Sequence, residues 1–189
     1  MIPIRENYKE YTPPRYVQFT IAKLLVNLPP RYLSGLECVV LTNGTAIGKG
    51  KVKVKGRKDL RKDCLGFYHP KSNQGQAWIE IVVDNIVASF PAGALPRLLW
   101  RVLLMPELKF AETLFHEIGH HLDYTIGAPA RSGEPAAEAW EKRLFGLYVR
   151  KRYWYLVPFT RFALRPVFEF LRTIFDRETR KRRATGKAF

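Results

Sequence analysis

Apolar residues recur every three or four positions in several segments of this chain, a spacing typical of helices that bury one face. Residues 14–28 form the first such segment, and the following Pro29 and Pro30 predict where it ends. A shorter helix is predicted over residues 95–105. The clearest helix runs from residue 107 to 125, and its apolar positions are Leu108, Ala111, Phe115, Ile118 and Leu122.

Gly127 and Pro129 predict a break after this helix, because glycine suits the left-handed conformation at a helix end and proline cannot continue the helix. Pro135 then suits the first turn of another helix, which apolar residues extend to about residue 155. The two helices are therefore expected to form a hairpin.

Short apolar runs bounded by turn residues predict strands at residues 36–41, 65–70 and 77–83. Residues 49–58 alternate lysine with valine. In a strand these lysines would share one side, as on a charged edge that resists aggregation; in a loop they would lie near a substrate cleft. Their charge fits a solvated surface and an anion-binding role equally well. Residues 1–13 are polar and are expected to form an extended arm.

Short strands flanked by helices predict an α+β fold, in which a small mixed or antiparallel sheet of about three to four strands packs on helices. The chain has 189 residues and is 47% hydrophobic, which is enough to bury a core. Residues 1–149 are expected to form one domain with an N-terminal arm and helix, and residues 150–189 a basic, aromatic helical extension.

The helix over residues 107–125 carries the pattern HExxH, in which His116 and His120 are four residues apart. On a helix they lie about 40° from one another and one turn apart, so both imidazoles can bind one metal ion. Glu117 would lie beside this ion, a position that suits a general base for a metal-activated water. The pattern predicts Zn²⁺ as the cofactor, although HExxH also occurs by chance in helices whose histidines are structural.

A catalytic zinc ion needs a third protein ligand as well as an open position. No histidine follows His121, so the third ligand is not a downstream histidine. Asp123 lies on the same helix and points along it, and the last three acidic residues lie in the basic tail. Glu134 and Glu138, four residues apart on the next helix, are therefore the candidates for the third ligand. Whichever of the two does not bind the metal could support one of its histidine ligands instead.

Together the two motifs resemble those of the gluzincins, zinc metallopeptidases with HExxH and a glutamate on a following helix, and especially the compact minigluzincins. These families often show E-x-x-A-E-x-aromatic, and the matching residues are Glu134, Ala137, Glu138 and Trp140. The resemblance implies a zincin-like fold and zinc-dependent hydrolysis of peptide bonds in a peptide or protein substrate. It makes Glu134 the third ligand and Glu138 the acid that hydrogen-bonds a zinc histidine. If the helix begins later than expected, Glu138 becomes the ligand and the roles shift by one turn.

The resemblance has two further implications for the site. Gluzincins commonly stabilise the oxyanion with a tyrosine or histidine, and the candidates here are Tyr148, Tyr124 and His121. In the minigluzincins the edge strand of the sheet pairs with an extended peptide, which would bind substrate through its main chain.

The net charge of the chain is +15, which attracts polyanions. Residues 150–189 contain 12 basic and 3 acidic residues interleaved with aromatics, a net charge of +9. This extension is either a helix docked on the core, an anionic-membrane surface helix or a nucleic-acid-binding arm. The alternative to a peptidase is therefore a non-catalytic zinc-containing binding protein that acts through this basic tail.

Only Cys38 and Cys64 are present, too few for a disulfide framework, which favours a reducing cytoplasm. The N-terminus lacks a basic region followed by an apolar core, so no secretory signal is predicted. The apolar residues 87–105 contain two arginines and two prolines, which argues against a membrane span. A cytoplasmic protein, with peripheral membrane attachment as an option, is expected.

Overall fold

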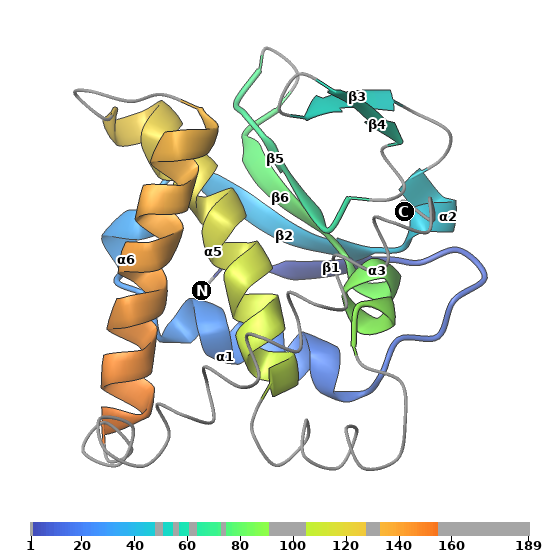
Figure 1. Ribbon diagram of the computed structural model, residues 1–189, viewed down its shortest axis with the longest axis horizontal. Coiled ribbons are helices and arrows are strands. Elements are labelled where there is room, and N and C mark those ends of the chain that lie inside the picture. The colour runs from blue at the N-terminus through green and yellow to red at the C-terminus, as the bar shows by residue number, and fades with distance from the viewer. Residues whose placement is uncertain are drawn as a thin grey trace. The chain divides into compact units, whose positions relative to one another are not determined.

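The computed structural model describes residues 2–47, 51–54, 57–60, 64–72, 75–90, 105–127 and 133–154 (Figure 1). The chain divides into two units, Met1–Leu147 and Tyr148–Phe189, and the sheet belongs to the first. The helix predicted over residues 95–105 and the extension from residue 155 onward lie outside the described residues. None of the helices in these described ranges has the length and apolar character needed to cross a bilayer.

A four-stranded mixed sheet forms the centre of the first unit, with the strand order β1-β2-β6-β5. Its strands are β1 (Ile4–Asn7), β2 (Leu36–Thr42), β5 (Gly66–His69) and β6 (Ala77–Val82). β1, β2 and β6 are parallel, whereas β5 runs antiparallel to β6 at one edge. This mixed sheet and its helices confirm the predicted α+β class, and β2, β5 and β6 confirm the three predicted strands.

The N-terminal segment is where the sequence prediction was wrong, because residues 4–7 form a strand rather than an arm. β1 pairs in parallel with β2, with Ile4 opposite Val39 and Asn7 opposite Thr42. Three of its four residues are exposed, so it carries no apolar alternation that could mark it in the sequence. Backbone pairing, including the bond from Val39 N–H to Pro3 O at 3.0 Å, holds it at the edge.

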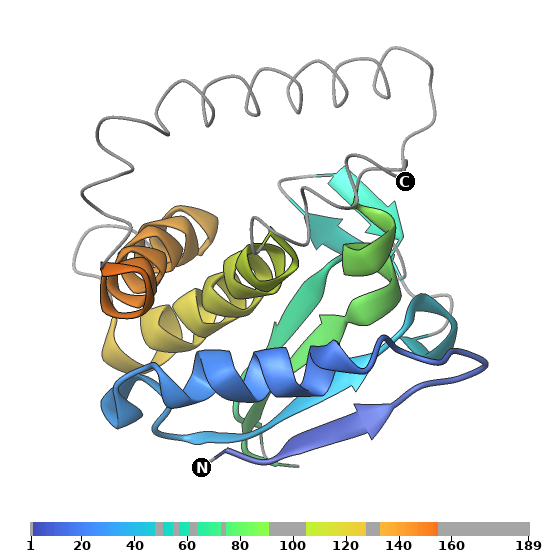
Figure 2. The ribbon, with the colours of Figure 1, turned by 90° about the horizontal axis from the view of Figure 1, so that it is seen from below.

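Helices α1 (Tyr16–Val26) and α5 (Met105–Ile126) pack against each other, and α5 lies against β5 and β6 (Figure 2). Both confirm predicted helices. Four of the five predicted apolar positions of α5 are buried, whereas Leu108 is half-buried; the apolar residues of α5 that are less than 2% exposed are Phe110, Ala111, Leu114, Phe115, Ile118 and Leu122. Burying each large side chain of this kind contributes about 1.5 to 3 kcal/mol, so the core fixes the rotation of α5.

Three short helices and a second sheet complete the described elements. The short helices are η1 (Pro30–Tyr32), α2 (Gly44–Ile47) and α3 (Val83–Ala88). α3 was not predicted, since it continues the apolar run of β6 with no turn residue between them. β3 (Lys51–Val54) and β4 (Arg57–Leu60) pair with each other in a separate two-stranded antiparallel sheet.

Helix α6 (Glu134–Arg152) follows α5 as predicted, and Asp123 fixes both ends of the connection. Gly127, with φ of +72°, ends α5 and donates its N–H to the carbonyl of Asp123 at 3.1 Å. Gly133, with φ of +79°, donates its N–H to the carboxylate of Asp123 at 2.8 Å immediately before α6 begins. Glycine is favoured at both positions because side chains strain a left-handed backbone.

The part of α6 that belongs to the first unit lies beside α5 (Figure 1), and the two helices are in close backbone contact at Gly119. A Cβ atom built on Gly119 would lie 2.6 Å from the carbonyl oxygen of Ala137 and 3.0 Å from its Cα. Those atoms are backbone, so the helices would have to separate to accommodate a side chain.

We therefore expect Gly119→Ala to lower the free energy of unfolding by about 1 to 3 kcal/mol, the usual cost of overpacking. Gly146→Ala is the matched control, since a Cβ atom there would meet nothing within 4 Å. That control should be neutral or stabilising by up to about 1 kcal/mol, because alanine is the better helix former. Urea denaturation followed by circular dichroism measures both, and equal effects would contradict the close packing at Gly119.

Candidate metal centre

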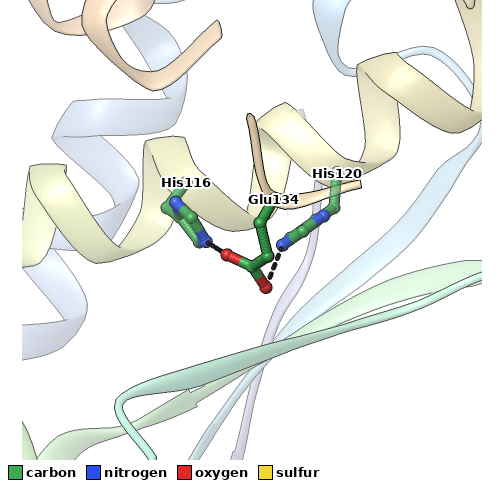
Figure 3. A group of neighbouring side chains, drawn as sticks. All are labelled: His116, His120 and Glu134. Atoms are coloured by element: carbon green, nitrogen blue, oxygen red, sulfur yellow. Dashed lines mark ion pairs between the residues drawn. The ribbon is translucent and has the colours of Figure 1, made fainter. Parts of the chain in front are cut away.

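Helices α5 and α6 bring together the three predicted metal ligands, His116, His120 and Glu134 (Figure 3). One potential ligand atom from each lies within 4.8 Å of the others. Glu134 Oε2 is 3.4 Å from His116 Nε2, and Glu134 Oε1 is 3.7 Å from His120 Nε2. Glu134 is the first residue of α6, and each of its two carboxylate oxygens therefore faces a different imidazole.

The donor set of this cluster suits a divalent transition metal ion. Two imidazole nitrogens and one carboxylate oxygen form a set found at catalytic zinc sites, although imidazole also suits copper, iron and nickel. All three residues are half-buried, so the cluster is neither sealed in the core nor fully solvated. The arrangement fits a bound metal ion without selecting which one.

His116 is held through its second ring nitrogen by Glu141, a residue that the sequence analysis did not select. The distance between His116 Nδ1 and Glu141 Oε2 is 3.0 Å. Glu141 follows Glu134 by seven residues on α6, about two turns, so both acids lie near one face of that helix. That spacing was visible in the sequence and could have added Glu141 to the candidates.

The two histidines differ in their electrostatic surroundings. The hydrogen bond to Glu141 raises the pKa of His116, against the opposing effect of burial. Burial lowers the pKa of His120, and the neighbouring His116 lowers it further. Metal ions bind the neutral imidazole, so the environment of His120 already favours the binding form, while that of His116 orients its ring.

Glu138 lies on α6 between the other two acids and is half-buried, outside the cluster of three potential ligands. The resemblance to the gluzincins assigned it the hydrogen bond to a zinc histidine, and that role stays a prediction. In the structure, the acid that hydrogen-bonds His116 is Glu141.

Glu117, the predicted general base, is buried between α5 and the edge strand β5, with only 7% of its surface exposed. Burial raises the pKa of its carboxyl to about 7, while nearby His116 and a hydrogen bond with the backbone of Tyr68 act in the opposite direction. β5 comes close at Gly66, where an added Cβ atom would lie 3.0 Å from Glu117 Cγ. A glycine at this position therefore leaves room for the carboxylate.

His121 and Tyr124, two candidates for the oxyanion stabiliser, both lie near Tyr68. His121 is buried and donates from Nε2 to the carbonyl of Ser34 at 2.8 Å, while its Nδ1 accepts from the hydroxyl of Tyr68 at 3.2 Å. Both of its ring nitrogens are thus engaged in joining α5 to its neighbours. Tyr124 is 64% exposed and follows His120 by one helical turn, so it is the accessible candidate.

Tyr148, the third candidate, lies in the second unit of the chain. It is 1% exposed, and its ring centroid lies 6.1 Å from that of Tyr153. Its predicted role at the oxyanion stays untested.

Comparisons with protein families, with curated proteins and with solved structures find no match to this chain. What the site can do therefore has to follow from its own residues and their geometry.

Removing Glu141 should weaken metal binding, because His116 would lose the group that orients its ring. We expect Glu141→Ala to lower the affinity for zinc by about 10- to 100-fold, the usual effect of losing such a partner. Competition with a chromophoric chelator measures this affinity, and Glu138→Ala is the matched control on the same helix. A larger loss with Glu138→Ala than with Glu141→Ala would return the orienting role to Glu138.

Proposed function

We propose that this chain is a zinc-dependent metalloendopeptidase of the gluzincin type. The observation that carries the proposal is the meeting of His116, His120 and Glu134 within 4.8 Å beside the buried carboxyl of Glu117. The three would hold the metal ion, and a bound zinc ion would supply a Lewis acid that polarises a carbonyl and lowers the pKa of water. HExxH and the glutamate of the following helix support this class of reaction.

Glu117 is the residue suited to move the proton. Its carboxyl has a pKa of about 7, so near neutral pH it can both accept a proton and release one. It would take the proton from the attacking water and give it to the leaving amine. Because it is buried against β5, few water molecules compete for its oxygens.

The edge strand β5 supports a peptide as the substrate. In the part of the chain that the structure describes, β5 pairs with β6 along one edge only. The strand also lies next to Glu117, through the backbone of Tyr68 and the close approach at Gly66. An extended peptide pairing with β5 would be held by main-chain hydrogen bonds close to the general base, with no demand for a particular sequence.

The alternative is a zinc-containing protein that binds a membrane or nucleic acid through residues 150–189. Residues 155–189 lie outside the residues that the structure describes, so no structural observation bears on most of this extension.

Glu117→Gln should lower the rate of peptide hydrolysis by about 10²- to 10⁴-fold, because the amide keeps the shape of the side chain but cannot accept the proton. The zinc content should stay unchanged, since Glu117 is not a ligand. Cleavage of a mixed peptide library, followed by mass spectrometry, measures the activity.

The matched control for this variant is Glu112→Gln, an exposed acid on the same helix that pairs with Lys109 at 2.7 Å. It should leave both activity and zinc content intact. Hydrolysis by the Glu117→Gln protein at the wild-type rate, or no hydrolysis by zinc-loaded wild-type protein on any peptide, would refute the proposal.

A further inference from the structure

The face of β5 that points away from α5 carries two aromatic side chains. Tyr68 on this strand bonds His121 of α5 at 3.2 Å, so its side chain points toward the helix. Side chains alternate between the faces of a strand, and Phe67 and His69 therefore lie on the opposite face. Both are half-buried, so this face of β5 is partly accessible to solvent.

The ring of His69 is held by two residues of the neighbouring strand β6. Trp78 lies directly across from it in the register, and the two rings stack with their centroids 3.7 Å apart and their planes at 7°. The Nε2 atom of His69 is also 3.1 Å from Oε2 of Glu80, whose side chain is 8% exposed. A buried carboxylate and a stacked indole thus hold the imidazole in one orientation before any partner binds.

The ring face of His69 that Trp78 does not cover points toward the outer edge of the sheet. Trp78 is on the β6 side of His69, and β5 is the last strand on the other side in the described part of the chain (Figure 1). The side chain of His69 is still 27% exposed. A peptide strand paired with β5 would lie about 4.8 Å further out, and its residue opposite His69 would share the same face. That side chain would therefore meet the uncovered face of the imidazole.

A planar aromatic side chain fits this position best. It can stack on the imidazole as a third ring beyond Trp78 and His69, and aromatic pairs contribute to binding beyond the area that they bury. An aliphatic side chain would contact the same ring without this stacking contribution. An acidic side chain would be placed near the buried carboxylate of Glu80, where like charges repel.

We propose that His69, oriented by Trp78 and Glu80, selects peptides that carry an aromatic residue opposite it. This inference rests on the proposed function, because it requires a peptide paired with β5. Gly66, the residue of β5 that approaches Glu117, precedes His69 by three positions. The aromatic residue would therefore lie at the same spacing from the peptide residue beside the general base, away from the cleaved bond.

The cleavage preference of the zinc-loaded full chain tests this proposal. In a mixed peptide library analysed by mass spectrometry, we expect aromatic residues to be enriched at one position that is not adjacent to the cleaved bond. Two peptides that differ only by phenylalanine or leucine at that position would then be compared. The wild type should favour phenylalanine by about 2- to 10-fold in kcat/KM, as an aromatic pair contributes.

Two variants of His69 separate selection from a structural role. His69→Ala should remove the preference by lowering kcat/KM for the phenylalanine peptide, with little change for the leucine peptide. His69→Phe keeps a ring at this position and should keep the preference. The control is Arg5→Ala, on the exposed edge strand at the other side of the sheet, which should leave both peptides unaffected. Circular dichroism would show that all three variants are folded.

Three results would overturn the proposal while leaving the peptidase activity in place. The first is an equal loss of kcat/KM for both peptides in His69→Ala, which would make His69 structural. The second is a wild type that cleaves the two peptides equally fast. The third is a wild type that prefers arginine at this position, which would assign the selection to the charge of Glu80.

Peptide binding distinguishes a failure of this inference from a failure of the proposed function, because it needs no hydrolysis. Fluorescence anisotropy would compare a labelled extended peptide that contains one phenylalanine with its leucine counterpart. Tighter binding of the phenylalanine peptide, lost in His69→Ala, would support the site even if the zinc-loaded wild type hydrolysed no peptide. Equal binding of the two peptides, or binding of neither, would overturn it.

Discussion

The contact between Gly119 on α5 and the backbone of Ala137 on α6 sets the geometry on which the metal centre depends. Because no side chain separates the two helices there, α6 can lie close enough for Glu134 to reach both His116 and His120. The same approach places Glu141, two turns further along, on the other nitrogen of His116. Helix α6 thus supplies one acid to each ring nitrogen of His116. The backbone packing at Gly119 fixes the rotation of this helix.

The other side of the site depends on β5. Gly66 lets this strand approach the buried carboxyl of Glu117, and the bridge from Tyr68 through His121 to Ser34 ties the strand to α5. The third histidine of the HExxH helix is therefore structural in this fold, while the first two face the potential metal site. The histidines and Glu117 project from a helix whose opposite face is the hydrophobic core.

Helical periodicity predicted α1, α5 and α6, whereas short apolar runs bounded by turn residues predicted the strands β2, β5 and β6. β1 escaped prediction because it is a short, mostly exposed edge strand held by backbone pairing. Helical spacing predicted that His116 and His120 share a face of one helix, and the resemblance to the gluzincins added Glu134 from the next helix; the structure brings the three together. The spacing of Glu141 from Glu134 was visible in the sequence, but its contact with His116 depends on how the two helices cross, which local spacing does not determine.

Whether His116, His120 and Glu134 bind one zinc ion can be measured as the metal content of protein purified without chelator. Inductively coupled plasma mass spectrometry would compare the wild type with Glu134→Ala and Glu138→Ala. We expect about one zinc ion per wild-type chain, and a much larger loss of zinc with Glu134→Ala than with Glu138→Ala, because Glu134 is a direct ligand. Absence of zinc from the wild type, even after reloading with the metal, would contradict it.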